Sequence, residues 1–236
     1  MKTSLKKIIF TGGSGRFGKV FKSKKNKFKI FYPNKKELNI LSQRSIIKYI
    51  KKTKPDYFIH AAGLSRPMSI HDENIKKSIN LNIIGTSNVV IACEKFKLKL
   101  IYFSTGYVYP GKKGNYKEND SINPFNKYAW SKLGGEASVK LYNNSLILRL
   151  IMCEKPFLHK TAYHDINTNF IFHEDVASYL PKLLNQKGTL NVGGKIQSIY
   201  NFAKKFDPQI KKASGKNYYP KNISMNISKL KKILKK

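Results

Sequence analysis

TGGSGRFG, at residues 11–18, is the stretch that decides the fold of this chain. It follows an apolar run at 5–11 that predicts a β-strand, and we expect a helix to open near Gly15. Gly12, Gly15 and Gly18 allow a tight turn and let the backbone approach a pyrophosphate, whose charge would meet the N–H groups at the helix start. An ordinary glycine-rich turn is the alternative. Because strand, spacing and helix context agree, we interpret the stretch as a dinucleotide-binding loop.

Strand and helix signals alternate through the first two-thirds of the chain. The predicted strands are 5–11, 27–32, 56–63, 98–105 and 145–151, and the predicted helices between them include 43–54, 73–97 and 127–142. Short apolar strands separated by helices indicate a parallel sheet covered on both faces. The predicted fold class is therefore α/β, a Rossmann-like doubly wound parallel sheet. The glycine loop, HAAG and STG all fall at carboxyl ends of strands, where such sheets bind ligands.

Beyond Ile151 the alternation weakens. Residues 154–169 are loop-like, and the later expected elements are helices at 173–186, 198–206 and 226–234 with a short strand at 188–194. We expect two domains. Residues 1–151 form the dinucleotide-binding Rossmann domain, and residues 152–236 form a small substrate-binding part, of which about 170–193 pack back on the Rossmann core.

The charge balance is strongly basic. The 236 residues hold 46 Lys+Arg against 13 Asp+Glu, a formal net charge of +33. Such a balance can mark a protein that binds nucleic acid or another polyanion. The lysines are spread along the whole chain, however, and Lys, Asn and Ile share A/T-rich codons. We therefore favour a compositional bias carried on a solvated surface, with no specific nucleic acid as partner, and keep polyanion binding as the alternative.

The remaining composition excludes several classes of protein and site. Cys93 and Cys153 are too few and too far apart for a disulfide framework or a cysteine-rich zinc site. The histidines at 159, 164 and 173 lack metal-like spacing with carboxylates, so we expect no metal. No apolar stretch is long enough to span a membrane. We expect a cytoplasmic protein with no membrane partner.

The end of the second strand bears on cofactor choice. NAD sites usually carry an acid there for the ribose hydroxyls, but this chain has no acid before Glu37. Arg16, Lys35 and Lys36 could hold a 2′-phosphate instead, unless these lysines merely belong to the lysine-rich surface. NADP(H) is therefore favoured, and NAD(H) is possible.

Tyr128 and Lys132 are four residues apart on a predicted helix, hence on one face. A phenol titrates near 10, and a neighbouring ammonium favours its anion, which makes it a usable proton donor and acceptor at neutral pH. Thr105, at the carboxyl end of a central strand, could hydrogen-bond a substrate carbonyl. We predict these three residues as the catalytic set.

Further motifs along nearly the whole chain carry a family resemblance. They are ELNI at 37–40, KPDYFIHAAG at 54–63, INLNIIGTSNV at 79–89, STGYVYPG at 104–111, PFNKYAWSKLGGE at 124–136, FIFHEDVA at 170–177 and ISMNISKL at 223–230. With the glycine loop, the chain resembles an extended short-chain dehydrogenase/reductase of the NAD-dependent epimerase/dehydratase superfamily. More narrowly it resembles a compact subgroup of the dTDP-4-dehydrorhamnose reductases, whose members act on sugar nucleotides in carbohydrate biosynthesis.

The resemblance implies roles for particular residues. It supports Thr105, Tyr128 and Lys132 as catalytic residues and a nicotinamide dinucleotide as hydride carrier. The implied cofactor-binding residues are Gly12, Gly15, Arg16, Phe17, Gly18, Ala61, Ala62, Gly63, Asn82, Tyr128 and Lys132. His60 either lines the cofactor crevice or is satisfied at its strand end.

Two departures limit what the resemblance implies. Gly106 stands where the family has an aspartate after the threonine, and RLIMCEK at 149–155 lacks the family's tryptophan. The stretch that follows is also shorter than in typical members. Fold and hydride chemistry therefore carry over better than the identity of the sugar.

The resulting functional hypothesis is an oxidoreductase, an NAD(P)H-dependent reductase of a 4-keto nucleoside-diphosphate deoxysugar. A sugar-nucleotide epimerase and a non-catalytic dinucleotide-sensing protein on the same fold are the alternatives. A dehydratase is disfavoured because its Thr-Asp-Glu is absent from TGY at 105–107. The expected partner is a nucleoside-diphosphate sugar, and a homodimer is left open.

Overall fold

The computed structural model describes residues 5–216 and 218–235. These ranges form two compact units. The first contains residues up to Ser104 together with Ser131–Ile147 and Leu183–Gly188. The second contains Thr105–Trp130, Leu148–Lys182 and the chain from Thr189 onward. The assignment of substrate binding to residues 152–236 stays a prediction.

A six-stranded sheet organises the fold. Its strand order is β10-β5-β4-β3-β1-β2, and the strands are β1 (Lys7–Thr11), β2 (Lys29–Phe31), β3 (Tyr57–His60), β4 (Lys99–Thr105), β5 (Ser145–Leu150) and β10 (Gly188–Val192). β1 pairs in parallel with both β2 and β3, and β3 pairs in parallel with β4. The chain therefore reverses its direction of winding between β1 and β3, which is the place where doubly wound sheets bind ligands. The predicted fold class is confirmed.

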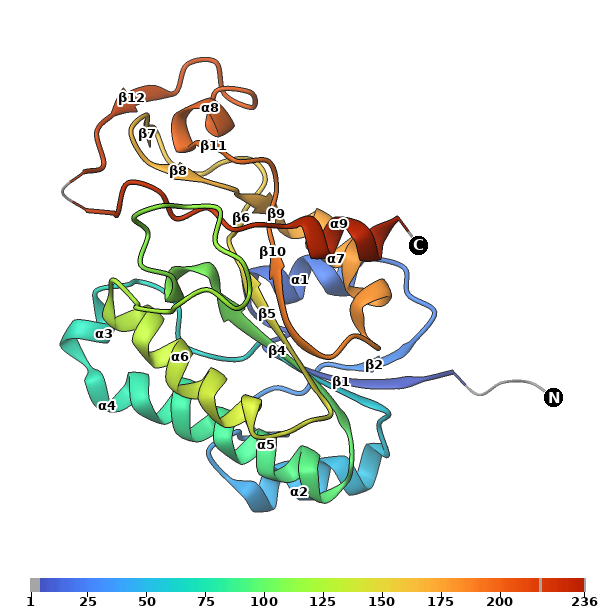
Figure 1. Cartoon of the computed structure of the whole chain (residues 1–236). Helices are drawn as coiled ribbons and strands as arrows, with labels where there is room; N and C mark the ends of the chain where they lie inside the picture. Colours follow the sequence, from blue (N-terminus) through green and yellow to red (C-terminus); the bar gives the residue numbers. More distant parts are fainter. Residues whose placement is uncertain (1–4, 217, 236) are drawn as a thin grey trace. The chain divides into compact units, whose positions relative to one another are not determined.

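Helices connect these strands. They are α1 (Arg16–Ser23), α2 (Gln43–Thr53), α3 (Ile70–Glu73), α4 (Ile75–Ser78), the π-helix η1 (Ile79–Ile84), α5 (Gly85–Lys95), the 3₁₀ turn η2 (Gly106–Val108), α6 (Lys127–Lys140), α7 (His173–Leu183), α8 (Ile199–Ala203) and α9 (Ser228–Leu234). Figure 1 shows α2, α5 and α6 along one face of the sheet and α1 on the other. The helix expected near Gly15 begins at Arg16, and α2 ends just before Pro55, as its sequence predicts.

Alternate residues of β1 pack on opposite faces of the sheet. Ile9 belongs to the buried cluster that includes Ile46 of α2 and Val89 of α5. Phe10, the next residue, stacks on α1, with its ring 5.2 Å from that of Phe21. A strand that is apolar on both faces in this way must be covered on both, which accounts for the two helical layers.

The segment 73–97, expected as one helix, is interrupted. α3 ends at Asn74, whose side chain accepts a hydrogen bond from the N–H of Lys77 and so starts α4. The π-helical turn η1 then precedes α5. Ile75 and Ile79 are 53% and 40% exposed while Val90 is buried, so the apolar residues of this segment do not share one buried face. A local Asn cap outcompetes the apolar periodicity at this position.

The second unit contains small two-stranded sheets that the sequence did not indicate. They are β6 (Met152–Cys153) with β9 (Ile171–Phe172), β7 (Thr161–Tyr163) with β12 (Lys211–Ala213), and β8 (Asn167–Thr168) with β11 (Gln197–Ser198). Strands of two or three residues give too little alternation to be recognised. Across residues 5–216 and 218–235, no helix has the length and hydropathy needed to cross a bilayer.

Two adjacent glycines of α6 provide a test of this packing. A Cβ at Gly135 would lie 2.4 Å from the backbone oxygen of Asn82, whereas one at Gly134 would meet only the side chain of Ile83, at 2.8 Å. We expect Gly135→Ala to destabilise the protein by about 1–3 kcal/mol, because backbone cannot move aside as a side chain can. Gly134→Ala, the matched control, should be near neutral, since alanine favours helix over glycine. Urea unfolding of both variants measures the difference, and equal stabilities would contradict the packing described.

Candidate active site

The glycine loop lies between the ends of β1 and β3 and leaves no room for side chains. A Cβ at Gly12, where φ is +87°, would be 2.8 Å from the backbone of Ala61, and one at Gly18 would be 2.3 Å from the oxygen of Gly12. Gly15 precedes α1 with no side chain capping the helix. The N-terminus of α1 and the bare loop together form a surface that fits a pyrophosphate. Phe17 faces away from it, because its ring packs 5.1 Å from that of Phe103 in the core.

The adenosine end of such a site would lie at the end of β2. There Tyr32 covers the loop, since a Cβ at Gly13 would be 2.9 Å from its ring. Burial raises the pKa of Tyr32 to about 12, so it carries no charge at neutral pH. Glu37 folds back on the chain and accepts a hydrogen bond from the N–H of Asn34 at 2.9 Å. The nearest acid is thus engaged in a turn, while Arg16 is exposed.

Asn82 joins three segments of the first unit. Its Oδ1 accepts from the N–H of Leu64 at 2.7 Å, and its Nδ2 donates to the carbonyl of Leu64 and to the hydroxyl of Ser131, each at 2.8 Å. The side chain is fully buried and sits in the π-helical turn η1. Turns of this kind are frequent at functional sites. Asn82 therefore holds the 61–64 turn against α6, and its assignment as a cofactor-binding residue stays a prediction.

Lys132 is one of the buried lysines of the first unit. The residue is 7% exposed, and its Nζ lies 4.2 Å from the ring centroid of Tyr102. Burial lowers the pKa of Lys132 to about 7, against the opposing charge of Glu136. Glu136 is itself fully buried and accepts a hydrogen bond from Ser104 at 2.7 Å. The ammonium is thus held over the ring of Tyr102, and the carboxylate of Glu136 acts on its charge.

His60 is satisfied at its strand end. Nδ1 lies 2.9 Å from the hydroxyl of Thr11 and Nε2 lies 3.2 Å from that of Thr86. Burial, with a smaller contribution from the charge of Lys132, lowers the pKa of His60 to about 3, so the ring is neutral. Of the two roles considered for His60, these contacts favour the structural one. Among the residues described, no group of three or more His, Cys, Asp and Glu side chains is placed to hold a metal ion.

The second unit carries Thr105 and Tyr128. Thr105 ends β4, and its Oγ1 accepts a hydrogen bond from the N–H of Tyr107 at 3.2 Å, which leaves the hydroxyl proton able to donate. The rings of Tyr107 and Tyr128 meet edge to face, 6.5 Å apart at 86°. α6 is capped by Asn126, whose side chain accepts from the N–H of Ala129 at 2.8 Å. Tyr128 therefore stands in the first turn of α6, one turn before Lys132.

Close packing around position 106 explains why a glycine stands there. A Cβ there would lie 2.6 Å from Cγ1 of Ile151 and 2.8 Å from Sδ of Met225. The aspartate that the resemblance leads one to expect at this position would require the side chains of Ile151 and Met225 to move aside. The departure therefore follows from how the second unit fills this space.

A buried polar network that the sequence did not single out supports the loop after η2. Arg149 is 1% exposed, and its guanidinium donates to the hydroxyl of Tyr109 at 2.7 Å and to the carbonyl of Glu118 at 3.1 Å. The Tyr109 hydroxyl donates in turn to Asn191 at 2.9 Å. The feature of the sequence that could have revealed this network is the arginine at 149 inside the otherwise apolar run SLILRLI at 145–151.

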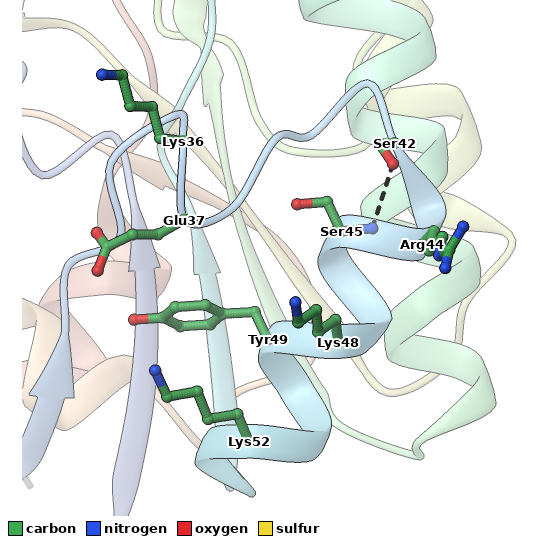
Figure 2. A pocket seen from close by; sticks show the side chains of 8 residues that line it. All are labelled: Lys36, Glu37, Ser42, Arg44, Ser45, Lys48, Tyr49 and Lys52. Carbon is green, nitrogen blue, oxygen red and sulfur yellow. Dashed lines mark hydrogen bonds between the residues drawn. The ribbon is translucent and has the colours of Figure 1, made fainter.

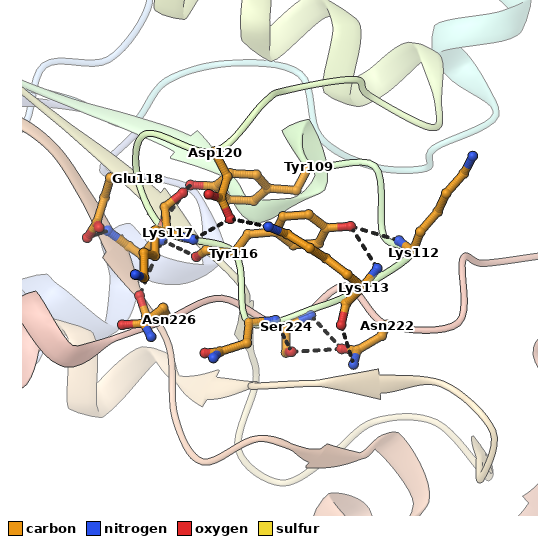
Figure 3. Close-up of polar contacts among 12 residues, drawn as sticks. Tyr109, Lys112, Lys113, Tyr116, Lys117, Glu118, Asp120, Asn222, Ser224 and Asn226 are labelled. Carbon is orange, nitrogen blue, oxygen red and sulfur yellow. Dashed lines mark hydrogen bonds and ion pairs between the residues drawn. The ribbon is translucent and has the colours of Figure 1, made fainter.

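The C-terminal segment holds the same loop from its other side. Figure 3 shows the hydrogen bonds between the loop from Tyr109 to Asp120 and the segment from Asn222 to Asn226. The N–H of Asn115 donates to the hydroxyl of Ser224 at 2.9 Å, and the N–H of Asn226 donates to the carbonyl of Tyr116 at 2.8 Å. The loop that follows Thr105 is thereby fixed within the second unit.

A basic pocket of about 440 Å³ lies on the outer side of α2. Its lining residues come later in the chain than the glycine loop. It is lined by Lys36, Glu37, Ser42, Arg44, Ser45, Lys48, Tyr49 and Lys52. Figure 2 shows Tyr49 pointing toward Glu37, with Lys48 and Lys52 beside it and Arg44 turned away. Burial and the charge of Glu37 both raise the pKa of Tyr49. The sequence analysis singled out Lys36 as a possible contact for a 2′-phosphate, and it treated the other cations here only as part of a generally basic surface.

Comparison with known proteins gives the following relatives. The Danio rerio methionine adenosyltransferase 2 subunit beta is 30% identical over 146 residues, 58% of this chain and 44% of that protein. The Dictyostelium discoideum dTDP-D-glucose 4,6-dehydratase is 29% identical over 272 residues, 96% of this chain and 60% of that protein. The chain thus covers less than two thirds of the length of these curated relatives.

Among solved structures, the dTDP-4-dehydrorhamnose reductase of Bacillus anthracis in complex with NADP superposes with a TM-score of 0.86 at 25% identity. The superposition covers 96% of this chain and 92% of the reductase. Residues 6–152 also match the family described as RmlD substrate binding domain. That span is more than half of the chain and includes the glycine loop, Asn82, Thr105 and the Tyr128–Lys132 pair. The chain belongs to the RmlD substrate binding domain family.

Proposed function

We propose that this protein is an NAD(P)H-dependent reductase of a 4-keto nucleoside-diphosphate deoxysugar. The observation that carries the proposal is a bare glycine loop at the switch point of the sheet, in a chain that also has Tyr128 and Lys132 one turn apart on α6. The B. anthracis reductase, which superposes over nearly the whole chain, is named for this activity and was solved with NADP.

The loop fits a dinucleotide because side chains are excluded from it. Gly12 and Gly18 sit where any Cβ would strike backbone, so only backbone faces the ligand. The N–H groups at the start of α1, including that of Phe17, would bind the pyrophosphate. Ala61, Ala62 and Gly63 would border the site. When bound, the nicotinamide supplies the hydride for the substrate carbonyl carbon.

The proton for the new hydroxyl would come from Tyr128. As the carbonyl carbon received the hydride, the carbonyl oxygen would gain negative charge and take the phenolic proton. One C–H and one O–H bond would form on the sugar, and a C–H bond of the reduced nicotinamide and the O–H bond of Tyr128 would break. Lys132 would stabilise the resulting phenolate and hold the ribose hydroxyls. Thr105 would donate a hydrogen bond to the same oxygen and polarise it. We place the sugar contacts in residues 152–236, as the sequence predicted.

Two alternative functions, a sugar-nucleotide epimerase and a dinucleotide-sensing protein, differ from this proposal in what happens to NADPH. An epimerase would use the same three residues but regenerate its cofactor, so it would consume no net NADPH. A non-catalytic dinucleotide-sensing role is favoured by the curated relative named as a subunit of an adenosyltransferase, which is not an oxidoreductase by name. Stoichiometric oxidation of NADPH by a 4-keto sugar nucleotide supports the reductase, whereas cofactor binding without turnover on any such substrate supports the sensing role.

Tyr128→Phe removes only the proposed proton donor. We expect turnover to fall about 10²–10⁴-fold, the usual contribution of general acid–base catalysis. Cofactor affinity and stability should change little, because Tyr128 is half-buried and loses one hydroxyl. Tyr218→Phe, at a 72% exposed tyrosine, is the matched control and should be silent. Single-turnover reduction followed at the nicotinamide absorbance measures both, and a near wild-type rate for Tyr128→Phe would refute the mechanism.

The pH dependence should follow Lys132. Its pKa is lowered to about 7 in the protein without dinucleotide, and the proposed mechanism needs its protonated form. The value of kcat/KM for NADPH, which reports the free enzyme, should therefore be full below pH 7 and fall as pH rises through 7. Glu136 raises the pKa of Lys132, so Glu136→Gln should move the fall to lower pH. A profile that stays flat to pH 9 would show that this lysine does not control activity.

We further infer that NADPH is preferred over NADH, with Arg16 binding the 2′-phosphate. Arg16→Ala should weaken NADPH binding by about ten-fold, the loss of one charge-assisted hydrogen bond, and leave NADH unchanged. Lys19→Ala removes an exposed cation one turn further along α1 and is the matched control. Calorimetric titration with both dinucleotides makes the comparison. Equal losses for NADPH and NADH would show that Arg16 does not recognise the 2′-phosphate.

A further inference from the structure

Lys99 begins β4 at the amino end of the sheet, and its ammonium group is buried. The residue is 8% exposed, and its Nζ has no hydrogen-bond partner among the described residues. Lysine is almost never buried unless it is paired, because an isolated ammonium loses its hydration without replacement. A buried, unpartnered ammonium in a well-packed strand therefore needs an explanation.

The charge of a second cation, Lys187, acts on it. Lys187 belongs to the same unit, in the segment Leu183–Gly188 that leads into β10. Its charge adds to the effect of burial in lowering the pKa of Lys99 to about 8. Two like charges in one place destabilise each other. No carboxylate contributes to the pKa of Lys99 in a way that would offset this repulsion.

Two neutral polar side chains complete the cluster. Tyr57 pairs with Lys99 across β3 and β4, so the two side chains stand together on one face of the sheet. The Tyr57 hydroxyl donates to Oδ1 of Asn185 at 2.8 Å, which ties the segment carrying Lys187 beside the strand. With its oxygen engaged, the amide of Asn185 still has its N–H groups to donate. The cluster thus gathers donors and positive charge.

We propose that Lys99, Lys187, Tyr57 and Asn185 form a binding site for the phosphate group of a small ligand. A tetrahedral dianion would supply the missing acceptor for the buried ammonium and cancel the repulsion between the lysines. Lysine binds phosphate as a point charge, whereas planar carboxylates suit the fork of arginine. Lys187 is exposed, so the ligand would enter from its side, and the buried ammonium of Lys99 would turn toward it.

This site is separate from the proposed active site. β4 runs for seven residues from Lys99 to Thr105, so the cluster and the carboxyl edge lie about 20 Å apart along the strand. Occupancy therefore does not depend on the reductase proposal. A variant that loses phosphate binding should still bind dinucleotide, and a failure of the reductase proposal would leave the phosphate site unaffected.

Thermal unfolding in orthophosphate and in chloride, at equal ionic strength and pH 7, tests the site. Wild-type Tm should rise by several degrees in phosphate, since a ligand of the native state stabilises it by mass action. Lys99→Met should abolish the rise. In chloride it should be at least as stable as wild type, because it removes an unpaired buried charge. Lys95→Met removes an exposed charge from the end of α5 and should keep the full phosphate response.

Calorimetry with Lys187→Gln gives a second measurement that does not alter the core. This exposed substitution should raise the Kd for orthophosphate at least about ten-fold, the loss expected for one charged hydrogen bond. A parallel titration with phenyl phosphate distinguishes free phosphate from the phosphate of a larger metabolite, since a site closed to substituents would bind only the former. Equal responses of wild type and Lys99→Met, or no wild-type response beyond that to chloride, would overturn the proposal.

Discussion

The buried amide of Asn82 is the interaction on which the geometry of the first unit depends. It binds both backbone groups of Leu64 and the hydroxyl of Ser131, and so ties the turn after β3 to η1 and α6. Because an amide offers both donors and an acceptor, one side chain can satisfy partners on two segments at once. A hydrocarbon of equal volume would fill the space and leave the N–H and the carbonyl of Leu64 without the hydrogen bonds that Asn82 provides.

The pKa values of the two buried lysines depend more on burial than on pairing with a carboxylate. Lys132 and Lys99 are both buried lysines whose pKa values are lowered chiefly by loss of water. Lys132 has an aromatic ring below it and a carboxylate in the next turn of its helix. Lys99 has neither. In this lysine-rich chain, some ammonium groups are therefore buried away from solvent. The residues around each of them determine its pKa and the partner that it can bind.

The sequence predicted the structure best where a short stretch of residues determines the local backbone by itself. The glycine loop was expected to turn tightly between a strand and a helix, and a Cβ at Gly12 or Gly18 would indeed meet backbone there. The parallel sheet followed from apolar strands between helices. The break at Asn74 was missed because a capping side chain competes with apolar periodicity at close range. Arg149 was missed because its partners, Tyr109 and Glu118, are distant in sequence and meet only in the folded unit.

The filled space around Gly106 also bears on how this protein can change. Ile151 and Met225 occupy the volume that any side chain at 106 would need. An acidic residue there would force both side chains to move, unless smaller residues replaced them. Each of the latter changes alone would open a cavity and destabilise the unit. Directed evolution that proceeds one substitution at a time would therefore lose stability at every first step, so a carboxylate at position 106 is better designed together with both replacements.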